Sequence, residues 1–466
     1  MSEEGLRSTD TADLVILGGG SGGYACALRA AELGLSVVLV EKDKLGGTCL
    51  HRGCVPTKAL LHAAEVADHA RDGGKVGIRS TFDGVDMAGV NSYKDGVVSR
   101  LHKGLQGLVA SRGITVVEGA GTLEGPGVVR VGDERWTGRN VVLATGSYAR
   151  SLPGLELDDR IVTSDAAISL DDVPQRVVVL GGGVIGVEFA SVWRSFGAEV
   201  TVVEALPRLV PGEDEFASTQ LARAFRRRRI TARTGVRFSK ATRQGDTVTV
   251  SLESGEEIEA DLLLVAVGRG PNTTGHGFAE AGVAMDGGFV TVDERLRTNL
   301  DGVFAVGDVT PGLQLAHRGF AHGIFVAEEV AGLSPVPVTD DGIPRVTYCD
   351  PEIASVGLTE ADARDRYGEV HTLTYDLAGN GKSQILQTSG AIKLVQAGPS
   401  GADGPVVGVH MVGSRVGELV GEAQLIYNWE ALPADVAALI HAHPTQSEAL
   451  GEAHLALAGK PLHTHG

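Results

Sequence analysis

Two cysteines are the side chains best suited to chemistry. Cys49 and Cys54 have four residues between them in GGTCLHRGCVPTK, and helix-like sequence follows from Lys58. The N-terminus of a helix favours the thiolate form of a cysteine, so a close pair at this place predicts a redox-active disulfide. The alternative is a pair of buried, reduced cysteines. A zinc site would need a second cysteine pair or two histidines at ligand spacing, whereas Cys26 and Cys349 stand alone and are expected in the core.

A glycine-rich turn follows the first apolar strand. Gly18, Gly20 and Gly23 have the spacing G-x-G-x-x-G between the strand DLVIL and the helix-like ACALRAAELG. The first glycine permits a tight turn, the second lets a pyrophosphate approach the backbone, and the third lets helix and strand pack closely. Glu41 ends the next strand, 18 residues after Gly23, where a carboxylate accepts hydrogen bonds from a ribose. These residues predict a dinucleotide site, and the alternative is a glycine-rich turn without a ligand.

The same pattern recurs 163 residues later. Gly181, Gly183 and Gly186 lie between the strand RVVVL and the helix-like VEFASVWRSFGAE, and Glu204 follows the last glycine by 18 residues. Two such units predict two dinucleotides, one flavin and one nicotinamide. A carboxylate at the ribose repels the 2′-phosphate of NADP, so Glu204 predicts NAD. Arg208, four residues further on, is interpreted as a solvated loop residue and not as a phosphate ligand.

Parallel strands must position these turns. Each glycine motif lies in a strand–turn–helix–strand unit, at residues 13–41 and 176–204, which is the βαβ unit of a doubly wound sheet. Helical sequence is expected at residues 58–72 and 86–112. After residue 344, strands such as GAIKLVQ are mixed with the helix-like GELVGEAQLIYNWEAL.

The composition indicates a globular protein. The chain has 466 residues, which predicts about three domains, and 43% hydrophobic residues argue against a disordered chain. No apolar run approaches the ~20 residues that span a bilayer, and the polar N-terminus lacks the features of a signal peptide. The net charge of −18 argues against a nucleic-acid partner, and the arginine run at 226–229 is interpreted as a solvated helix end. We therefore expect a soluble, cytoplasmic protein.

Five motifs together resemble those of one enzyme family. GGTCLHRGCVPTK is similar to a redox motif, VVLATG and LLLVAVGRGPN to two strand–turn motifs, TNLDGVFAVGD to a second flavin motif, and HAHPTQSEA to a C-terminal catalytic motif. In this order they resemble the pyridine nucleotide–disulfide oxidoreductases over nearly the whole chain. Within that family the chain most resembles the dihydrolipoamide dehydrogenases. The resemblance implies FAD and NAD as cofactors.

The resemblance implies a role for each reactive side chain. Cys49 would exchange with the substrate disulfide, and Cys54 would face the flavin and form a charge-transfer complex with it when reduced. Lys58 would pair with Glu188 beside the central ring of the flavin, where a cation stabilises developing negative charge. Without the resemblance, Lys58 and Glu188 would be interpreted as a surface lysine and an ordinary helix glutamate.

The resemblance also implies an acid–base dyad of His443 and Glu448. A carboxylate fixes the tautomer of a histidine and makes it a stronger base, which suits removal of a thiol proton. Pro444 restricts the backbone of His443. His441 suggests a metal-binding pair of histidines as an alternative, but no carboxylate or cysteine completes the expected ligand set. No metal is expected.

Further cofactor contacts follow from the same resemblance, and among them Asp308 would hold the ribityl chain of FAD. The implied FAD contacts are Gly18, Gly20, Gly23, Glu41, Lys58, Gly146, Asp308, Ala316 and His317, and the implied NAD contacts are Gly181, Gly183, Gly186, Glu204 and Gly268.

Three residues depart from the family pattern. His51 and Arg52 lie between the cysteines, where added positive charge could tune the thiolates. His322 stands where a glutamate is common, and the sequence offers no physical account of it.

The predicted fold is α/β, with two doubly wound, Rossmann-like dinucleotide-binding domains and a C-terminal α+β dimerisation domain. Residues 1–150 and 271–343 would form a split FAD-binding domain, residues 151–270 the NAD-binding domain, and residues 344–466 the interface domain.

The predicted activity is oxidation of protein-bound dihydrolipoamide, with electrons passing through Cys49–Cys54 and FAD to NAD. The family implies a homodimer with shared active sites and, as partner, a lipoyl-bearing acyltransferase subunit of a 2-oxo acid dehydrogenase complex. The alternatives are a glutathione- or mycothiol-type reductase, a mercuric reductase, a flavin-dependent quinone or electron-transfer reductase without thiol catalysis, and a structural subunit. Glu204 argues against the first, and the absence of a cysteine after Cys349 argues against the second.

Overall fold

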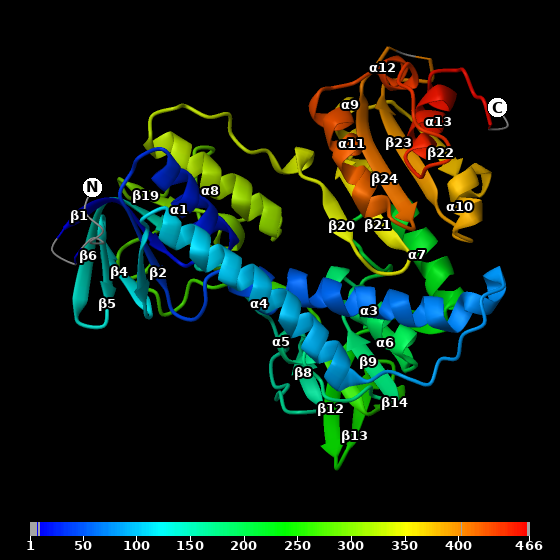
Figure 1. The fold of residues 1–466 in the computed structure, drawn as a ribbon, viewed down its shortest axis with the longest axis horizontal. Helices are drawn as coiled ribbons and strands as arrows, with labels where there is room; N and C mark the ends of the chain where they lie inside the picture. Colours follow the sequence, from blue (N-terminus) through cyan, green and yellow to red (C-terminus); the bar gives the residue numbers. More distant parts are fainter. Residues whose placement is uncertain (1–6, 8–9, 402, 464–466) are drawn as a thin grey trace. The chain divides into compact units, whose positions relative to one another are not determined.

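The structure of the chain is a computed structural model that describes residue 7, residues 10–401 and residues 403–463. The chain folds into two compact units. The first contains the segment that ends at Leu60, together with Ala88–Arg150 and Arg269–Asp340. The second contains Leu61–Met87, Ser151–Gly268 and the segment from Asp341 onward. Each unit combines helices with sheets (Figure 1).

The first unit is built on a parallel sheet. Its central strands are β1 (Thr11–Leu17), β2 (Val37–Glu41) and β6 (Glu134–Leu143), and β3 (Thr115–Glu118) and β19 (Val303–Ala305) lie outside them. The register pairs Leu17 with Val40 on one side and with Leu143 on the other, so three strands end level. An antiparallel hairpin of β4 (Gly121–Gly125) and β5 (Val128–Val131) extends from the first half of β6.

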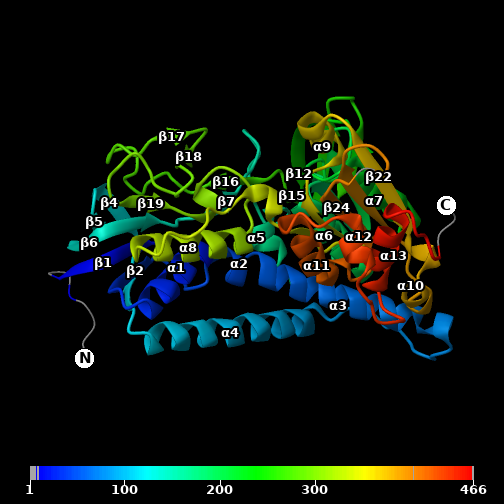
Figure 2. The same ribbon diagram turned by 90° about the horizontal axis from the view of Figure 1, so that it is seen from above.

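Both faces of this sheet are buried, which explains why its strands are apolar throughout. Leu14 and Ile16 pack into a core with α1 (Ser21–Glu32) and α8 (Ala316–Val330). Val15 and Leu17 point to the opposite face and pack with residues such as Trp136 and Phe278. In Figures 1 and 2, α1 and α8 lie side by side on one face of the sheet.

Glycines set the distance between α1 and α8. A Cβ atom on Gly323 would lie 2.2 Å from the Gly22 carbonyl oxygen, and one on Gly319 would lie 3.3 Å from the Gly22 nitrogen. No side chain fits at Gly323 at that distance, so α8 is held against the first turn of α1. The remaining elements that lie wholly or partly in this unit are α2 (Gly47–His51), α3 (Cys54–Asp72), α4 (Met87–Ser111), β7 (Ser147–Ala149), β16 (Arg269–Pro271), β17 (Met285–Asp286), β18 (Phe289–Val290), η2 (Gly307–Val309) and η3 (Asp340–Gly342).

The second unit contains a second parallel sheet, in the order β11-β10-β9-β15-β8. Its βαβ core is β9 (Arg176–Leu180), α6 (Val184–Phe196) and β10 (Glu199–Glu204). The other elements of this part are η1 (Gly73–Val76), β8 (Ile161–Thr163), α5 (Ser164–Ala167), α7 (Glu215–Arg227), β11 (Ile230–Thr234), β15 (Leu262–Val265) and a three-stranded antiparallel meander of β12 (Phe238–Gln244), β13 (Thr247–Leu252) and β14 (Glu257–Ala260).

The C-terminal part of the second unit has an antiparallel sheet in the order β20-β21-β24-β23-β22. Ile392, Leu394 and Val409 pack in one apolar core with residues of the helices α11 (Val416–Asn428) and α13 (Glu448–Leu457). The two parallel sheets and this α+β part confirm the predicted fold class. The elements are β20 (Arg345–Thr347), β21 (Glu352–Gly357), α9 (Glu360–Tyr367), β22 (Val370–Asp376), η4 (Leu377–Gly379), α10 (Gly381–Ile385), β23 (Ala391–Ala397), β24 (Val406–Gly413), α11 (Val416–Asn428), α12 (Pro433–Ala437) and α13 (Glu448–Leu457).

Two local expectations need correction. The second cysteine lies inside the helix that was expected from Lys58, because α3 begins at Cys54. Pro56 does not prevent this, since the first turn of a helix has unpaired N–H groups in any case.

Within the helices of the described part of the chain, none has both the length and the apolar character needed to cross a membrane.

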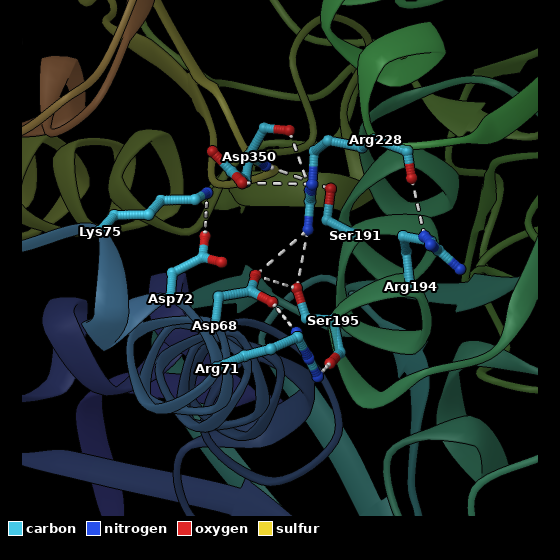
Figure 3. A network of polar contacts seen from close by, with 9 residues as sticks. All are labelled: Asp68, Arg71, Asp72, Lys75, Ser191, Arg194, Ser195, Arg228 and Asp350. Carbon is cyan, nitrogen blue, oxygen red and sulfur yellow. Dashed lines mark hydrogen bonds and ion pairs between the residues drawn. The ribbon is translucent and has the colours of Figure 1, made fainter. Parts of the chain in front are cut away.

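The arginine run at 226–229 is not uniformly solvated, which is the second correction. Arg228 follows the last turn of α7 and has a side chain that is only 17% exposed. Its guanidinium donates to the Ser195 hydroxyl (2.7 Å) and to the Asp350 carbonyl (3.0 Å), and it pairs with Asp68 (3.4 Å). Figure 3 shows these groups converging on Arg228 from α3, α6 and the loop before β21.

The same network anchors the segment before β21 to α6. The Asp350 amide donates to the Ser191 hydroxyl at 3.1 Å. One turn of helix away, the Ser195 hydroxyl donates to Asp68 at 2.5 Å, and Arg71 donates to the Ser195 carbonyl at 2.7 Å. Arg228 therefore joins three elements of the second unit through charged hydrogen bonds, which are stronger than neutral ones.

Replacing Arg228 should destabilise the second unit. Arg228→Met would leave Asp68 and Asp350 without their shared cation, so we expect the free energy of unfolding to fall by about 2 kcal/mol. Arg226→Met, in the same run but exposed, is the matched control and should change it by less than about 0.5 kcal/mol. Urea denaturation followed by circular dichroism measures both. Equal effects of the two substitutions would contradict the role given to Arg228.

Candidate active site

The predicted cofactor residues of the first unit gather at one edge of its sheet. Gly18 follows β1, Glu41 ends β2, Gly146 follows β6, and Asp308 follows β19. These are the carboxyl ends of neighbouring parallel strands, the edge at which open α/β sheets bind ligands. Ala316 and His317 are the first two residues of α8. The topology thus brings together residues that are far apart in the sequence.

The first glycine motif has the shape that a pyrophosphate needs. A Cβ atom on Gly18 would lie 2.3 Å from the Ala144 carbonyl oxygen, and one on Gly23 would lie 1.8 Å from the Gly18 carbonyl oxygen. A Cβ atom on Gly20 would meet nothing nearer than Gly47, at 3.9 Å. Only the middle glycine therefore leaves its backbone open to a ligand, and it stands directly before α1, whose N-terminus attracts a phosphate. The residues present fit a dinucleotide.

Glu41 holds the glycine turn as well as facing the ligand edge. One of its carboxylate oxygens accepts from the Gly19 amide at 2.7 Å, and the other accepts from the Asp43 amide at 2.9 Å. Each carboxylate oxygen has a second lone pair. Glu41 can therefore accept a hydroxyl hydrogen bond without releasing the turn.

Asp308 is held by residues that sequence reasoning does not single out. The Ser147 hydroxyl donates to its Oδ2 at 2.6 Å, and Arg269 in turn donates to the Ser147 hydroxyl at 2.8 Å. Ser147 directly follows VVLATG, and Arg269 lies in LLLVAVGRGPN. The two strand–turn motifs could therefore have pointed to Ser147 and Arg269. Their contact with Asp308 joins segments that are far apart in the chain. β7 and β16, which carry Ser147 and Arg269, form an antiparallel pair.

The second unit repeats the geometry of the first. A Cβ atom would lie 2.3 Å from the Ala266 carbonyl oxygen at Gly181 and 1.9 Å from the Gly181 carbonyl oxygen at Gly186, whereas at Gly183 it would meet no atom within 4 Å. Glu204 accepts from the Gly182 amide at 2.7 Å, as Glu41 does from Gly19. This motif also fits a dinucleotide.

Two further residues named from the sequence, Gly268 and Arg208, lie in the second unit. Gly268 follows β15 at the same edge of the sheet. Arg208 is half-buried, and its guanidinium donates to the carbonyls of Glu213 and Pro211 at 2.7 and 2.8 Å and to the Ser218 hydroxyl at 2.9 Å. Arg208 is therefore a structural residue of the loop, more buried than predicted, and its guanidinium is directed to loop atoms.

The two cysteines lie on consecutive helices of the first unit. Cys49 is in α2 and Cys54 is the first residue of α3, and both are thiols in this structure. A hydrogen bond with the Cys54 sulfur, together with burial, raises the pKa of the Cys49 thiol, and the Lys58 cation lowers it. The net effect is a raised pKa of the Cys49 thiol. Because the Cys49 and Cys54 sulfurs interact, their protons leave in two steps, and the Cys49 thiol keeps its proton until a base removes it.

Tyr24 is a further residue at the cysteines that the sequence does not reveal. It lies on α1, and its ring packs against Phe320 with 5.5 Å between ring centres. Burial and the charges of Cys49 and Cys54 raise the pKa of Tyr24 to about 12. Its hydroxyl therefore remains protonated and able to donate a hydrogen bond near the pair.

The departures from the family pattern have local explanations. His51 donates from Nε2 to the Leu45 carbonyl at 2.9 Å and its ring meets that of His102 edge-on. Arg52 pairs with Asp43 at 3.0 Å on the surface. His322 is buried on α8, and its Nδ1 accepts from the Gly307 amide at 3.3 Å.

The predicted dyad is formed in the second unit. His443 Nδ1 lies 3.1 Å from both carboxylate oxygens of Glu448, which is the first residue of α13. Glu448 also accepts from the Thr445 amide at 3.1 Å, which fixes its orientation. Because Nδ1–H donates to the carboxylate, Nε2 is left as the basic nitrogen. The His443 side chain is 76% exposed, so this nitrogen is accessible.

Two other residues named from the sequence, Glu188 and His441, also lie in the second unit. Glu188 lies on α6 and is buried, and its carboxylate accepts from the Tyr348 amide at 2.9 Å. Its pairing with Lys58 stays a prediction. His441 is bound to Glu422 at 2.7 Å and packs against Gly451. Among the residues that the structure describes, no group of three or more His, Cys, Asp or Glu side chains is arranged to hold a metal ion.

The middle glycine of the second motif offers a direct test of nucleotide binding. Gly183→Ala adds a methyl group where the fold leaves space and where φ is −76°, so the protein should keep its melting temperature. The methyl group would separate a phosphate from the backbone, so we expect the KM for NAD to rise about tenfold.

Gly181→Ala is the matched comparison. Its φ of 110° and the nearby Ala266 carbonyl leave no room for a methyl group, so this variant should lose about 3 kcal/mol of folding stability. An unchanged KM in Gly183→Ala, or a loss of stability there, would contradict the assignment.

Comparisons with known proteins agree with this geometry. Residues 12–323 match the model of the pyridine nucleotide-disulphide oxidoreductases, and residues 343–454 match the model of their dimerisation domain. A dihydrolipoyl dehydrogenase of Bacillus subtilis is 38% identical over 97% of this chain and 99% of its own length. A mitochondrial dihydrolipoyl dehydrogenase of Pisum sativum is 36% identical over 98% of this chain and 93% of its own length.

Among solved structures, LpdA of Mycobacterium tuberculosis is similar, with a TM-score of 0.89, 26% identity and coverage of 95% of this chain and 99% of that one. The matches confirm the prediction of an NAD-dependent oxidoreductase with FAD and NAD as cofactors, and the dimerisation domain supports a homodimer. The chain belongs to the pyridine nucleotide–disulphide oxidoreductase family.

Proposed function

We propose that this enzyme oxidises protein-bound dihydrolipoamide to lipoamide and passes the electrons to NAD. The observation that carries the proposal is the His443–Glu448 dyad, with an oriented and accessible base, in a chain of which 97% aligns with a dihydrolipoyl dehydrogenase. A dithiol substrate must lose thiol protons, and this dyad is suited to accept them.

The cysteine pair accounts for the thiol chemistry. In the proposed reaction, one substrate thiolate attacks Cys49 of the Cys49–Cys54 disulfide, an S–S bond to the substrate forms, and Cys54 leaves as a thiolate. The second substrate thiolate then attacks the substrate sulfur of the mixed disulfide, and Cys49 leaves. The substrate has lost two electrons, and the enzyme holds them as the dithiol. FAD and NAD, held at the two glycine motifs, would supply the two-electron and hydride chemistry that takes these electrons from the dithiol.

His443 would handle the protons of this exchange. Nδ1–H stays on Glu448, and Nε2 takes a proton from the substrate thiol. The raised pKa of Cys49 means that its thiol also needs a base in the reverse direction. Lys58 lies close enough to Cys49 to lower that pKa, in keeping with its proposed place at the redox centre.

We also propose that each active site is shared between two chains. Two large apolar side chains of the C-terminal part are open in the single chain: Ile440, three residues before His443, is 99% exposed and Trp429 is 75% exposed. Such side chains are usually covered by a partner. In a two-fold dimer each contact occurs twice, which gives two equivalent sites.

The wider assignments belong to the same proposal. We propose a FAD-binding domain of residues 1–150 and 271–343, an NAD-binding domain of residues 151–270 and an interface domain of residues 344–466. The partner would be a lipoyl-bearing acyltransferase subunit of a 2-oxo acid dehydrogenase complex, and the compartment would be the cytoplasm. The alternatives are a reductase of glutathione or mycothiol disulfide and a quinone reductase.

Steady-state kinetics of the purified protein test the proposal. NAD reduction by dihydrolipoamide should be more efficient than NADPH oxidation by glutathione or mycothiol disulfide, and NAD should be preferred to NADP by more than about tenfold because Glu204 repels a phosphate. His443→Gln should lower kcat/KM for dihydrolipoamide by about 100-fold or more.

The control is His463→Gln. His463 Nδ1 also bonds a glutamate of α13, Glu452, at 2.9 Å, but it lies outside the catalytic motif, so activity should stay within about threefold of wild type. A preference for NADPH with a small disulfide, or equal losses in the two histidine variants, would refute the proposed function.

A further inference from the structure

His322 is a buried histidine whose protonation state is defined by geometry. It is 2% exposed, and its Nδ1 faces the Gly307 amide at 3.3 Å. A backbone N–H can only donate, so Nδ1 must be the acceptor and the ring hydrogen must lie on Nε2. Burial and the Arg318 cation lower the pKa of His322 to about 4, so the ring is neutral at neutral pH.

The Gly307 amide belongs to the turn that carries Asp308. Gly307 has a φ of 70°, which favours glycine, and its carbonyl accepts from the Thr310 amide and hydroxyl at 3.0 and 2.8 Å. Arg318 donates to the Thr310 hydroxyl at 3.3 Å. Arg318 and His322 are one helical turn apart on α8, so this helix holds the turn through Thr310 and through the Gly307 amide.

The turn presents Asp308 at the ligand edge of the sheet. Its Oδ2 accepts from Ser147, whereas no described residue donates a hydrogen bond to Oδ1. Asp308 follows β19, level with the edge at which the Gly18 turn opens. A carboxylate oxygen at this edge suits a hydroxyl group of a bound nucleotide.

We propose that His322 is a positioning residue for the flavin nucleotide, which holds the Gly307 turn so that Asp308 keeps one carboxylate oxygen directed to the ligand. This rests on the proposed role of Asp308. The same helix packs through Gly319 and Gly323 on Gly22, in the first turn of α1. α8 therefore packs against the first turn of α1 and also holds the turn that carries Asp308.

The proposal predicts which substitutions of His322 keep flavin affinity. Asn places its side-chain oxygen near the position of Nδ1, Gln reaches instead toward the position of Nε2, and Leu has no acceptor. Leaving the buried Gly307 amide unpaired should loosen the turn, so we expect the dissociation constant of FAD to rise about tenfold in His322→Leu. His322→Asn should stay within about threefold of wild type, and His322→Gln should lie between them.

The measurement is titration of the apoprotein with FAD, followed by flavin fluorescence, together with the melting temperature of each apoprotein. His276→Leu is the matched control, because His276 is also buried in the first unit and bonds a backbone carbonyl, that of Gly121. It should lower the melting temperature and leave the FAD dissociation constant within about threefold of wild type.

Wild-type affinity in His322→Leu, or an equal loss in His276→Leu, would overturn the proposal. If His322→Leu does not fold, the order of Asn and Gln decides: weaker binding in the Asn variant than in the Gln variant overturns it. FAD binding is measured without substrate. A wild-type protein that fails to oxidise dihydrolipoamide would refute the proposed function and leave this inference standing.

Discussion

The cofactor sites depend on a close approach between a strand and a helix that only glycine permits. At Gly23 a Cβ atom would lie 1.8 Å from the Gly18 carbonyl oxygen, and at Gly186 it would lie 1.9 Å from the Gly181 carbonyl oxygen. These close contacts place the N-terminus of α1 next to the end of β1 and the N-terminus of α6 next to the end of β9. The positive end of the helix and the open backbone of the middle glycine then face the same place, which suits a phosphate. Glu41 and Glu204 brace the two turns by accepting a backbone N–H.

The remaining parts of the sites are held by contacts between distant segments. Ser147 and Arg269 orient Asp308, and Tyr348 orients Glu188, through single hydrogen bonds that join segments more than 120 residues apart. The reactive groups are otherwise mobile side chains, so fixed partners reduce the freedom that must be lost when a substrate binds. The dyad is held in the same way, because the Thr445 amide fixes the Glu448 carboxylate and this carboxylate fixes the His443 ring.

The local features could be predicted from the sequence, and the long-range ones could not. The spacing of Gly18, Gly20 and Gly23 within a strand–turn–helix pattern predicts their arrangement because all partners lie within a few residues. The solvated position predicted for Arg228 is wrong because its partners Asp68 and Asp350 are 160 and 122 residues away in the chain. The raised pKa of the Cys49 thiol could not be predicted either, because it depends on the neighbouring sulfur and on burial, neither of which the local sequence reveals.

The central claim is that thiol chemistry near the start of the chain is served by a base about 390 residues later, contributed by a second chain. Complementation tests this directly. Homodimers of Cys49→Ser and of His443→Gln should both be nearly inactive. Refolding them together gives about half heterodimers, each with one site that keeps both residues, so about a quarter of wild-type activity should return. If heterodimers form and no activity returns, each site lies within one chain and the account is contradicted.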